Sequence, residues 1–157
     1  MASGCCGVPV HRLPSRTDLQ DFGMNKVVPR GIRNNNPLNI RIGNTWLGER
    51  QNPQDASFEE FVSIEYGYRA AFCLLRRYIR RFRKNTIAMI ISTWAPSSEN
   101  NTQRYIDYVA NAMKITSDTP IAYEDEVTMV RLVAAMQMME CGVPADLVKV
   151  KRGYQLA

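Results

Sequence analysis

Three consecutive asparagines followed by a proline, Asn34 to Pro37, constrain the folding of this chain more than any other feature. Asparagine amides bind nearby backbone groups and tolerate turn conformations, and the proline ring disfavours a helical conformation at the preceding residue. The segment therefore predicts a loop that leads into a short strand at 38–42. Arginines and further amides flank it on both sides. It is either an ordinary turn or part of a functional site.

The rest of the chain divides into an arm, a strand region and a series of helices. Residues 1–28 contain scattered glycines and prolines without a sustained period, which predicts a flexible N-terminal arm. Between 38 and 63, short apolar runs alternate with turn residues, which predicts two or three strands of a small antiparallel sheet. A length of 157 residues suits one domain at 29–157. The expected fold class is α+β, mainly α, with about five helices and that sheet near the N-terminus.

Capping residues and apolar periods define the predicted helices after the long one at 65–84. Thr86 is expected to cap the second helix, and Asn100 or Asn101 the third. The segments 124–139 and 145–154 are predicted as the last two helices. The first of these is apolar on more than one face, so we expect it at the centre of the domain.

The net charge of +5 comes from one predicted helix, because six basic residues lie between positions 76 and 84 and the remaining chain is nearly neutral. They occupy the polar faces of an amphipathic helix, which is typical of a solvated basic surface. The functional alternative is attraction to an anionic partner such as teichoic acid, lipid headgroups or nucleic acid. Aromatic residues recur only on the buried stripe of this helix, which disfavours nucleic acid as a partner.

Composition limits the chemistry that the chain can perform. His11 is the only histidine and lies in the predicted arm, which excludes a histidine-based triad or zinc site in the folded domain. The four cysteines show no metal-ligand spacing and are expected to be reduced. No metal or organic cofactor is implied. Acid–base chemistry would therefore use carboxylates, which suits the cleavage of sugars better than that of esters or amides.

The sequence also bears on localisation. It contains no run of about 18 apolar residues and no apolar secretory signal at its N-terminus. We therefore expect a protein without a membrane span that is made in the bacterial cytoplasm. Transport in a virion, or through a membrane opened by a holin, would bring it to the cell wall.

Two pairs of motifs resemble known families. The segments R-G-I-R-N-N-N-P-L-N-I-R at 30–41 and W-A-P-S-S-E-N-N-T at 94–102 resemble motifs of phage and prophage virion-associated proteins, over about residues 29–157. The N-P-L-N-I-R part and the segment T-Q-R-Y-I-D-Y-V at 102–109 are also similar to parts of glucosaminidases and lytic transglycosylases. The resemblance implies a lysozyme-like domain whose partners are peptidoglycan glycan strands and other virion proteins.

Such hydrolases use a glutamic acid at the end of a core helix to protonate the glycosidic oxygen, and this helix precedes the strand region. Here no glutamate precedes the asparagine-rich segment. Glu140 instead ends the apolar helix near the C-terminus, before Cys141 and Gly142, similar to the Glu-Ser-Gly helix end of those enzymes. A circular permutation would bring it opposite the asparagine loop, since chain termini often lie close together. The alternative is an ordinary exposed glutamate, although its charge would oppose the helix dipole there.

Two further glutamates are candidates for a second carboxylate. Glu99 lies near Trp94, whose ring could pack on a sugar, but it could equally stabilise the start of the following helix. Glu49 lies in the predicted strand region, where it is either the second carboxylate of a glycosidase or a solvated hairpin residue. The expected substrate-binding residues are amides, one arginine and aromatic residues, namely Asn34, Asn36, Asn39, Arg41, Trp46, Trp94, Asn100 and Tyr105.

The favoured interpretation is a phage- or prophage-associated glycosidase of peptidoglycan, either a hydrolase or a lytic transglycosylase, with Glu140 as general acid. The alternative is a non-catalytic virion structural or interaction protein, which the missing upstream glutamate favours. The two differ in one structural consequence, because an enzyme should place Glu140 in a groove near Glu99 or Glu49.

Overall fold

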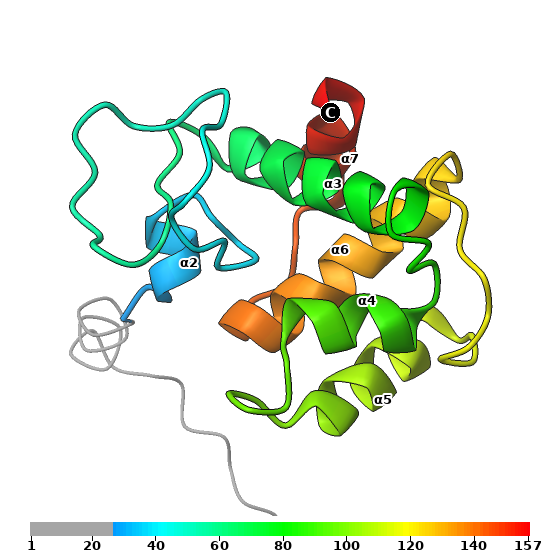
Figure 1. The fold of residues 1–157 in the computed structure, drawn as a ribbon. Coiled ribbons are helices and arrows are strands. Elements are labelled where there is room, and N and C mark those ends of the chain that lie inside the picture. Colours follow the sequence, from blue (N-terminus) through cyan, green and yellow to red (C-terminus); the bar gives the residue numbers. More distant parts are fainter. Residues whose placement is uncertain (1–26) are drawn as a thin grey trace, which may run out of the picture.

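The computed structural model describes residues 27–157, which form six helices (Figure 1). These are α2 (Arg30–Arg33), α3 (Ile64–Arg80), α4 (Ile87–Trp94), α5 (Thr102–Met113), α6 (Glu126–Cys141) and α7 (Leu147–Leu156). The arm predicted at 1–28 lies outside the described residues except for its last two.

Helix α6 lies at the centre of the helical part of the molecule. It packs against α5 and α7, while α3 packs against α7, and the C-terminal end of α6 approaches α2 (Figure 1). Its side chains Met129, Leu132, Val133 and Met136 are completely buried. Burial of this apolar surface is the main force that holds the helices together. The central position that the sequence predicts for 124–139 is confirmed.

Side-chain caps fix the starts of helices α4 to α7. Thr86 and Asn101 accept backbone N–H groups from the first turns of α4 and α5, as the sequence predicts. Asp125 and Asp146 do the same for α6 and α7. Gly142 ends α6 in the left-handed conformation, with a φ of 64°. Local sequence chemistry therefore sets the boundaries of the helices.

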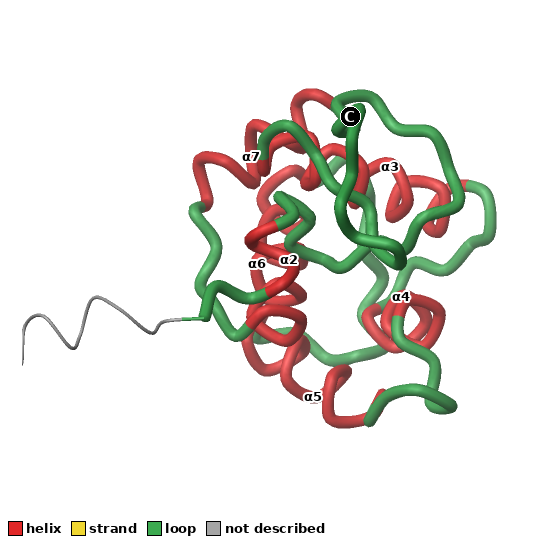
Figure 2. The backbone as a smooth tube through the Cα atoms, turned by 90° about the vertical axis from the view of Figure 1, so that its left-hand side faces the viewer, coloured by secondary structure: helices red, strands yellow, loops and turns green. Residues whose placement is uncertain are grey.

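The predicted antiparallel sheet is wrong. No strand occurs among residues 27–157, and the segment 34–63, hereafter the loop region, follows an irregular path (Figure 2). Two isolated bridges join Arg41 to Phe58 and Glu49 to Phe61. The expected α+β fold class therefore fails in its sheet, whereas its mainly helical character agrees with the structure. Helix α2 also lies in a segment that the sequence predicts as loop.

The physical reason is that turn residues interrupt the loop region, so backbone pairing stays limited to short stretches and side chains bind other backbone groups. The amide of Asn36 is completely buried and donates to the carbonyl oxygens of Ile40 and Glu59 at 2.8 and 3.0 Å, and its oxygen accepts the Ile40 N–H at 2.9 Å. The buried Glu60 carboxylate pairs with Arg50 at 2.8 Å. Backbone bonds between the bridged segments, such as that from the Glu59 N–H to the Ile40 oxygen at 2.9 Å, act together with these side chains to satisfy backbone groups without a regular strand.

The loop region lies directly on α3 at Gly67. A Cβ atom at this position would lie only 2.0 Å from the backbone oxygen of Asn35, so a larger residue would separate the two segments. The neighbouring contact is a hydrogen bond of 3.0 Å from the Asn35 amide to the carbonyl oxygen of Phe61. The asparagine-rich segment is therefore fixed against the helices.

Candidate functional site

A groove runs between the loop region and the C-terminal ends of α4 and α6. Its central hollow, of about 200 Å³, is lined by Asn39, Arg41, Phe58, Trp94, Ala95, Glu99, Asn100 and Glu140. A second hollow of about 270 Å³ shares Asn39, Arg41 and Trp94 with it. A third, of about 420 Å³, shares Asn100 and Glu140. The three hollows are therefore neighbours, and together they are called the groove below.

Glu140 lines both the central and the third hollow. Its two oxygens have separate partners. The Asn39 amide donates to Oε2 at 3.1 Å, and the Tyr105 hydroxyl donates to Oε1 at 3.1 Å. These bonds fix the orientation of the carboxyl group, while its position in two hollows leaves it accessible from the groove.

The surroundings of Glu140 favour its protonated form. Burial raises the pKa of Glu140 above the usual value of 4.5, and hydrogen bonds from Asn39, Tyr105 and Trp94 lower it by less than burial raises it. A partly buried carboxyl of this kind keeps its proton to a higher pH than an exposed glutamate. It can therefore act as a proton donor to a molecule bound in the groove.

Close packing of α2 on the end of α6 brings Asn39 to Glu140. At Gly31 of α2, a Cβ atom would lie 2.7 Å from three atoms, which belong to Asn36, Asn39 and Cys141. Only glycine therefore allows this approach. Asn39 has a φ of 51°, in the left-handed region that asparagine tolerates better than most residues. The asparagine-rich segment thus supplies one wall of the groove and α6 the other.

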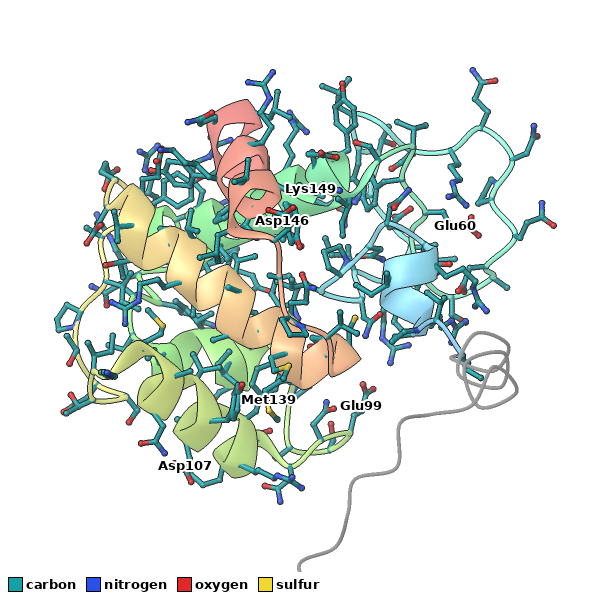
Figure 3. The ribbon with its side chains drawn as sticks, turned by 180° about the vertical axis from the view of Figure 1, so that it is seen from behind. Glu60, Glu99, Asp107, Met139, Asp146 and Lys149 are labelled. Atoms are coloured by element: carbon teal, nitrogen blue, oxygen red, sulfur yellow. The ribbon has the colours of Figure 1, made fainter. Side chains whose placement is uncertain are left out.

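Glu99 faces the same hollow as Glu140 from the loop after α4, and Figure 3 shows it near the end of α6 that carries Met139. Unlike Glu140 it is mostly exposed, and it forms an ion pair with Arg41 at 3.3 Å. The Arg41 guanidinium also lies 5.2 Å from the centre of the Phe58 ring. The groove thus holds two carboxyl groups in different environments, one protonated more readily and one paired with a cation.

Aromatic rings form the apolar part of the groove. Trp94 lines both the central and second hollows and packs edge-to-face on Tyr78, with ring centres 6.2 Å apart. Tyr105 lines the third hollow. Rings with an apolar face and a polar edge suit a ligand that has both characters, such as a sugar.

The structure brings seven of the predicted site residues together and leaves four elsewhere. The seven that line the groove are Asn39, Arg41, Trp94, Glu99, Asn100, Tyr105 and Glu140. Asn34 and Asn36 are buried, and their amides bind Asp55 and the loop backbone instead. Glu49 accepts the backbone N–H of Trp46, whose side chain packs against the core, and neither residue lines the groove.

Several lining residues of the groove were not among the predicted site residues, and three of them carry an aromatic ring or a charge. Phe58 falls in the predicted strand region, and Tyr78 belongs to the apolar stripe of the long helix. Arg104 lines the third hollow next to Tyr105. Its place within the segment T-Q-R-Y is the one sequence signal that could have identified it, whereas Phe58 and Tyr78 carry no such signal.

Two further surveys concern the described part of the chain. Across residues 27–157, no three His, Cys, Asp or Glu side chains are arranged to hold a metal ion. In the same range, every helix is too short or too polar to cross a bilayer.

Comparison with known proteins gives one informative relationship. No protein-family model matches the chain. The chain is similar to Protein P5 of Pseudoalteromonas phage PM2, with 37% identity over 131 residues, which cover 80% of this chain and 80% of that protein. Identity at this level over most of both chains indicates common descent.

Proposed function

We propose that this chain, which belongs to the family of Protein P5 of Pseudoalteromonas phage PM2, cleaves the glycan strands of peptidoglycan with Glu140 as general acid. Family membership identifies it as a protein of phage type. The single observation that carries the proposed activity is the Glu140 carboxyl, which has a raised pKa and is held by two hydrogen bonds in an open groove. The motif resemblance to cell-wall hydrolases supports peptidoglycan as the substrate.

In the proposed reaction, protonated Glu140 gives its proton to the glycosidic oxygen as the bond between that oxygen and C1 of the sugar breaks. Positive charge then develops on the sugar ring. The Glu99 carboxylate in the same hollow would stabilise that charge or orient the attacking water. Water adds to C1, and its proton returns to the Glu140 carboxylate, which restores the enzyme. In a transglycosylase, the 6-hydroxyl of the same sugar replaces water and gives up its proton in the same way.

The remaining groove residues suit the polar groups of a glycan strand. The amide of Asn100 can donate to the N-acetyl oxygen of a sugar and accept its N–H. Arg104 in the third hollow can bind a carboxylate of the peptide stem. The Trp94 ring would pack on the apolar face of a sugar.

The test is the release of soluble fragments from purified peptidoglycan sacculi. Glu140→Gln should reduce the rate at least 100-fold, because it removes the proton while preserving size. Glu126→Gln is the matched control, since it makes the same change at the other end of α6, and it should retain activity. Wild-type activity in a folded Glu140→Gln protein would contradict the assignment.

A second candidate function is a phage protein that binds the same glycan without cutting it. The observation that favours it is the ion pair between Arg41 and Glu99, which occupies the second carboxylate of the groove. This function predicts that the wild-type chain co-sediments with sacculi, releases no fragments, and loses binding when Trp94 is replaced by alanine. Fragment release by the wild type decides against it.

A further inference from the structure

A second surface, at the C-terminal end of α3, combines an exposed aromatic ring with arginines. Phe82 is 46% exposed. The guanidinium carbons of Arg77 and Arg81 lie 5.5 and 5.7 Å from the centre of its ring, within the range of cation–π contacts. Arg83 follows in the chain and is also exposed. Arg77, Arg81, Phe82 and Arg83 are called the Phe82 patch below.

The positive charges of the Phe82 patch are not neutralised by the fold. Its neighbour Arg80 pairs with Glu124. By contrast, Arg77, Arg81 and Arg83 form no salt bridge with any carboxylate among residues 27–157. Three uncompensated cations around one ring create a local positive potential that attracts anions.

Packing does not explain the exposed ring either. A phenylalanine side chain that remains half in water forgoes much of the free energy that its burial would provide. Arg83 has a φ of 57°, in the left-handed region that a long side chain adopts at a cost. Exposed apolar surface surrounded by charge often marks an interaction site.

The Phe82 patch lies near the start of α6, whereas Glu140 lies near its C-terminal end. The end of α3 is tied to the start of α6, because Arg80 pairs with Glu124 just before that helix. Glu140 lies near the other end of the same helix, about 21 Å along its axis from Glu126 at 1.5 Å per residue. Figure 1 shows this arrangement. A partner on the patch would therefore leave the Glu140 carboxyl accessible, although the second hollow of the groove extends to Tyr78, next to Arg77.

We propose that the Phe82 patch binds the anionic surface of a lipid membrane. Arg77, Arg81 and Arg83 would contact headgroup phosphates, and the Phe82 ring would enter the boundary between headgroups and acyl chains. A membrane can bind both the arginines and the phenylalanine of the patch, because a bilayer has an apolar layer directly beneath an anionic one. Duplex nucleic acid covers its bases, and single strands are bound by several stacking rings in a row, whereas the patch presents one. The inference does not depend on the proposed function.

The test measures binding of the full chain to vesicles of phosphatidylcholine, with and without phosphatidylglycerol. We expect binding only to vesicles that contain phosphatidylglycerol, and weaker binding as salt is added. Arg77→Gln with Arg81→Gln should lower the partition coefficient roughly 30-fold. Phe82→Ser should lower it by about fivefold and make the remaining binding fully reversible by salt.

The matched control removes the same two charges elsewhere. Lys149→Gln with Arg152→Gln changes exposed residues of α7, and Gly153, next to Arg152, packs on α3 at Tyr68, nine residues before Arg77. This variant should bind like the wild type. Equal loss in both double variants would show attraction by net charge alone and overturn the proposal.

Two other results would also overturn the membrane assignment. One is equal binding to vesicles without phosphatidylglycerol. The other is a chain that does not bind anionic vesicles but binds an oligonucleotide, and loses that binding when Phe82 is replaced. Glu140→Gln should bind vesicles normally, so the failure of the proposed glycosidase activity and the failure of this inference are distinguishable.

Discussion

The two walls of the groove are stabilised in different ways. The helical wall belongs to a continuous apolar core in which Phe72, Ile90 and Leu132 are completely buried. The loop region instead contributes four of the five buried polar or charged residues, namely Asn34, Asn36, Glu59 and Glu60. A wall built on apolar packing can carry a partly buried acid, and a wall built on hydrogen bonds can present amides to it.

Asn36 and Asn39 have different roles within the loop region. Three residues apart, one amide is buried and holds the loop backbone, and the other reaches the Glu140 carboxyl. Asparagine therefore stabilises the loop backbone at position 36 and contributes to the candidate site at position 39. Five predictions test this contrast between the two walls.

The largest effect is expected for the acid on the helical wall. Glu140→Gln should reduce the initial rate of fragment release roughly 1,000-fold, within the range for loss of a general acid. Replacement of Asn39 by alanine should cost far less, because the amide orients the acid and does not transfer the proton. An equal loss of activity in Glu140→Gln and Asn39→Ala would contradict the different roles assigned to the two walls.

The next effect is the cost of a cavity in the helical wall. Leu132→Ala should lower the free energy of unfolding by about 3 kcal/mol, since the side chain is completely buried. Denaturant titration followed by circular dichroism measures it. Leu147→Ala, at an exposed position, is the control. A cost near zero for Leu132→Ala would mean that apolar packing does not dominate this wall.

The corresponding change in the loop region removes a polar residue. Asn36→Ala leaves the backbone groups that its amide binds without partners and should cost about 2 kcal/mol. Hydrogen exchange should accelerate mainly between 34 and 63, because local opening follows local contacts. The exposed Asn52→Ala serves as control. If hydrogen exchange accelerated equally in the helices, the loop region would not be stabilised separately from the helical wall.

A smaller effect concerns stability against pH. The raised pKa of Glu140 means that its ionised form is disfavoured in the folded protein relative to the unfolded chain. The contribution of Glu140 to the stability of the wild type should therefore fall as the pH rises from about 4.5 through the raised pKa, and stay lower above it.

Glu140→Gln carries no such penalty. At neutral pH it should be more stable than the wild type, and the difference should shrink as the pH falls below the raised pKa of Glu140. Thermal unfolding of both proteins across this range measures it. A variant that is less stable than the wild type at neutral pH would show that the carboxylate is favoured by the fold.

The smallest effect is a shift in the pH dependence of activity. Activity should fall on the alkaline side as Glu140 loses its proton. The Asn39 amide lowers the pKa of Glu140, so Asn39→Ala should raise that pKa and move the alkaline limb to higher pH. A purely structural role for Asn39 predicts lower activity with no movement of the limb. Rates of fragment release measured at several pH values distinguish a structural role of Asn39 from an effect on the pKa of Glu140.

The same contrast explains what the sequence could predict. Helix periods and caps are local, so residues such as Thr86 and Asn101 identified the starts of α4 and α5 correctly. Short apolar runs between glycines were interpreted as strands. The sequence does not show that side chains bind the backbone of distant residues there. The hydrogen bond from the Asn36 amide to the Glu59 carbonyl oxygen, 23 positions away, is one example. Helix α2, with four residues, is too short to show a period.

The candidate site was predictable where a motif or a helix end marked it. Glu140 was identified from its place at the end of an apolar helix, and Asn39 and Tyr105 from segments similar to those of cell-wall enzymes. Phe58 and Tyr78 line the groove only because separate segments pack together. No local pattern distinguishes such residues from ordinary core aromatics.

Mass analysis of the soluble fragments that the full chain releases from purified sacculi tests the central claim most directly. We expect fragments with intact peptide stems, separated at glycosidic bonds of the strand, and none of these from Glu140→Gln. Fragments cut within the peptide stems, or the same glycosidic products from the variant, would contradict Glu140 as the general acid of a glycan-cleaving enzyme.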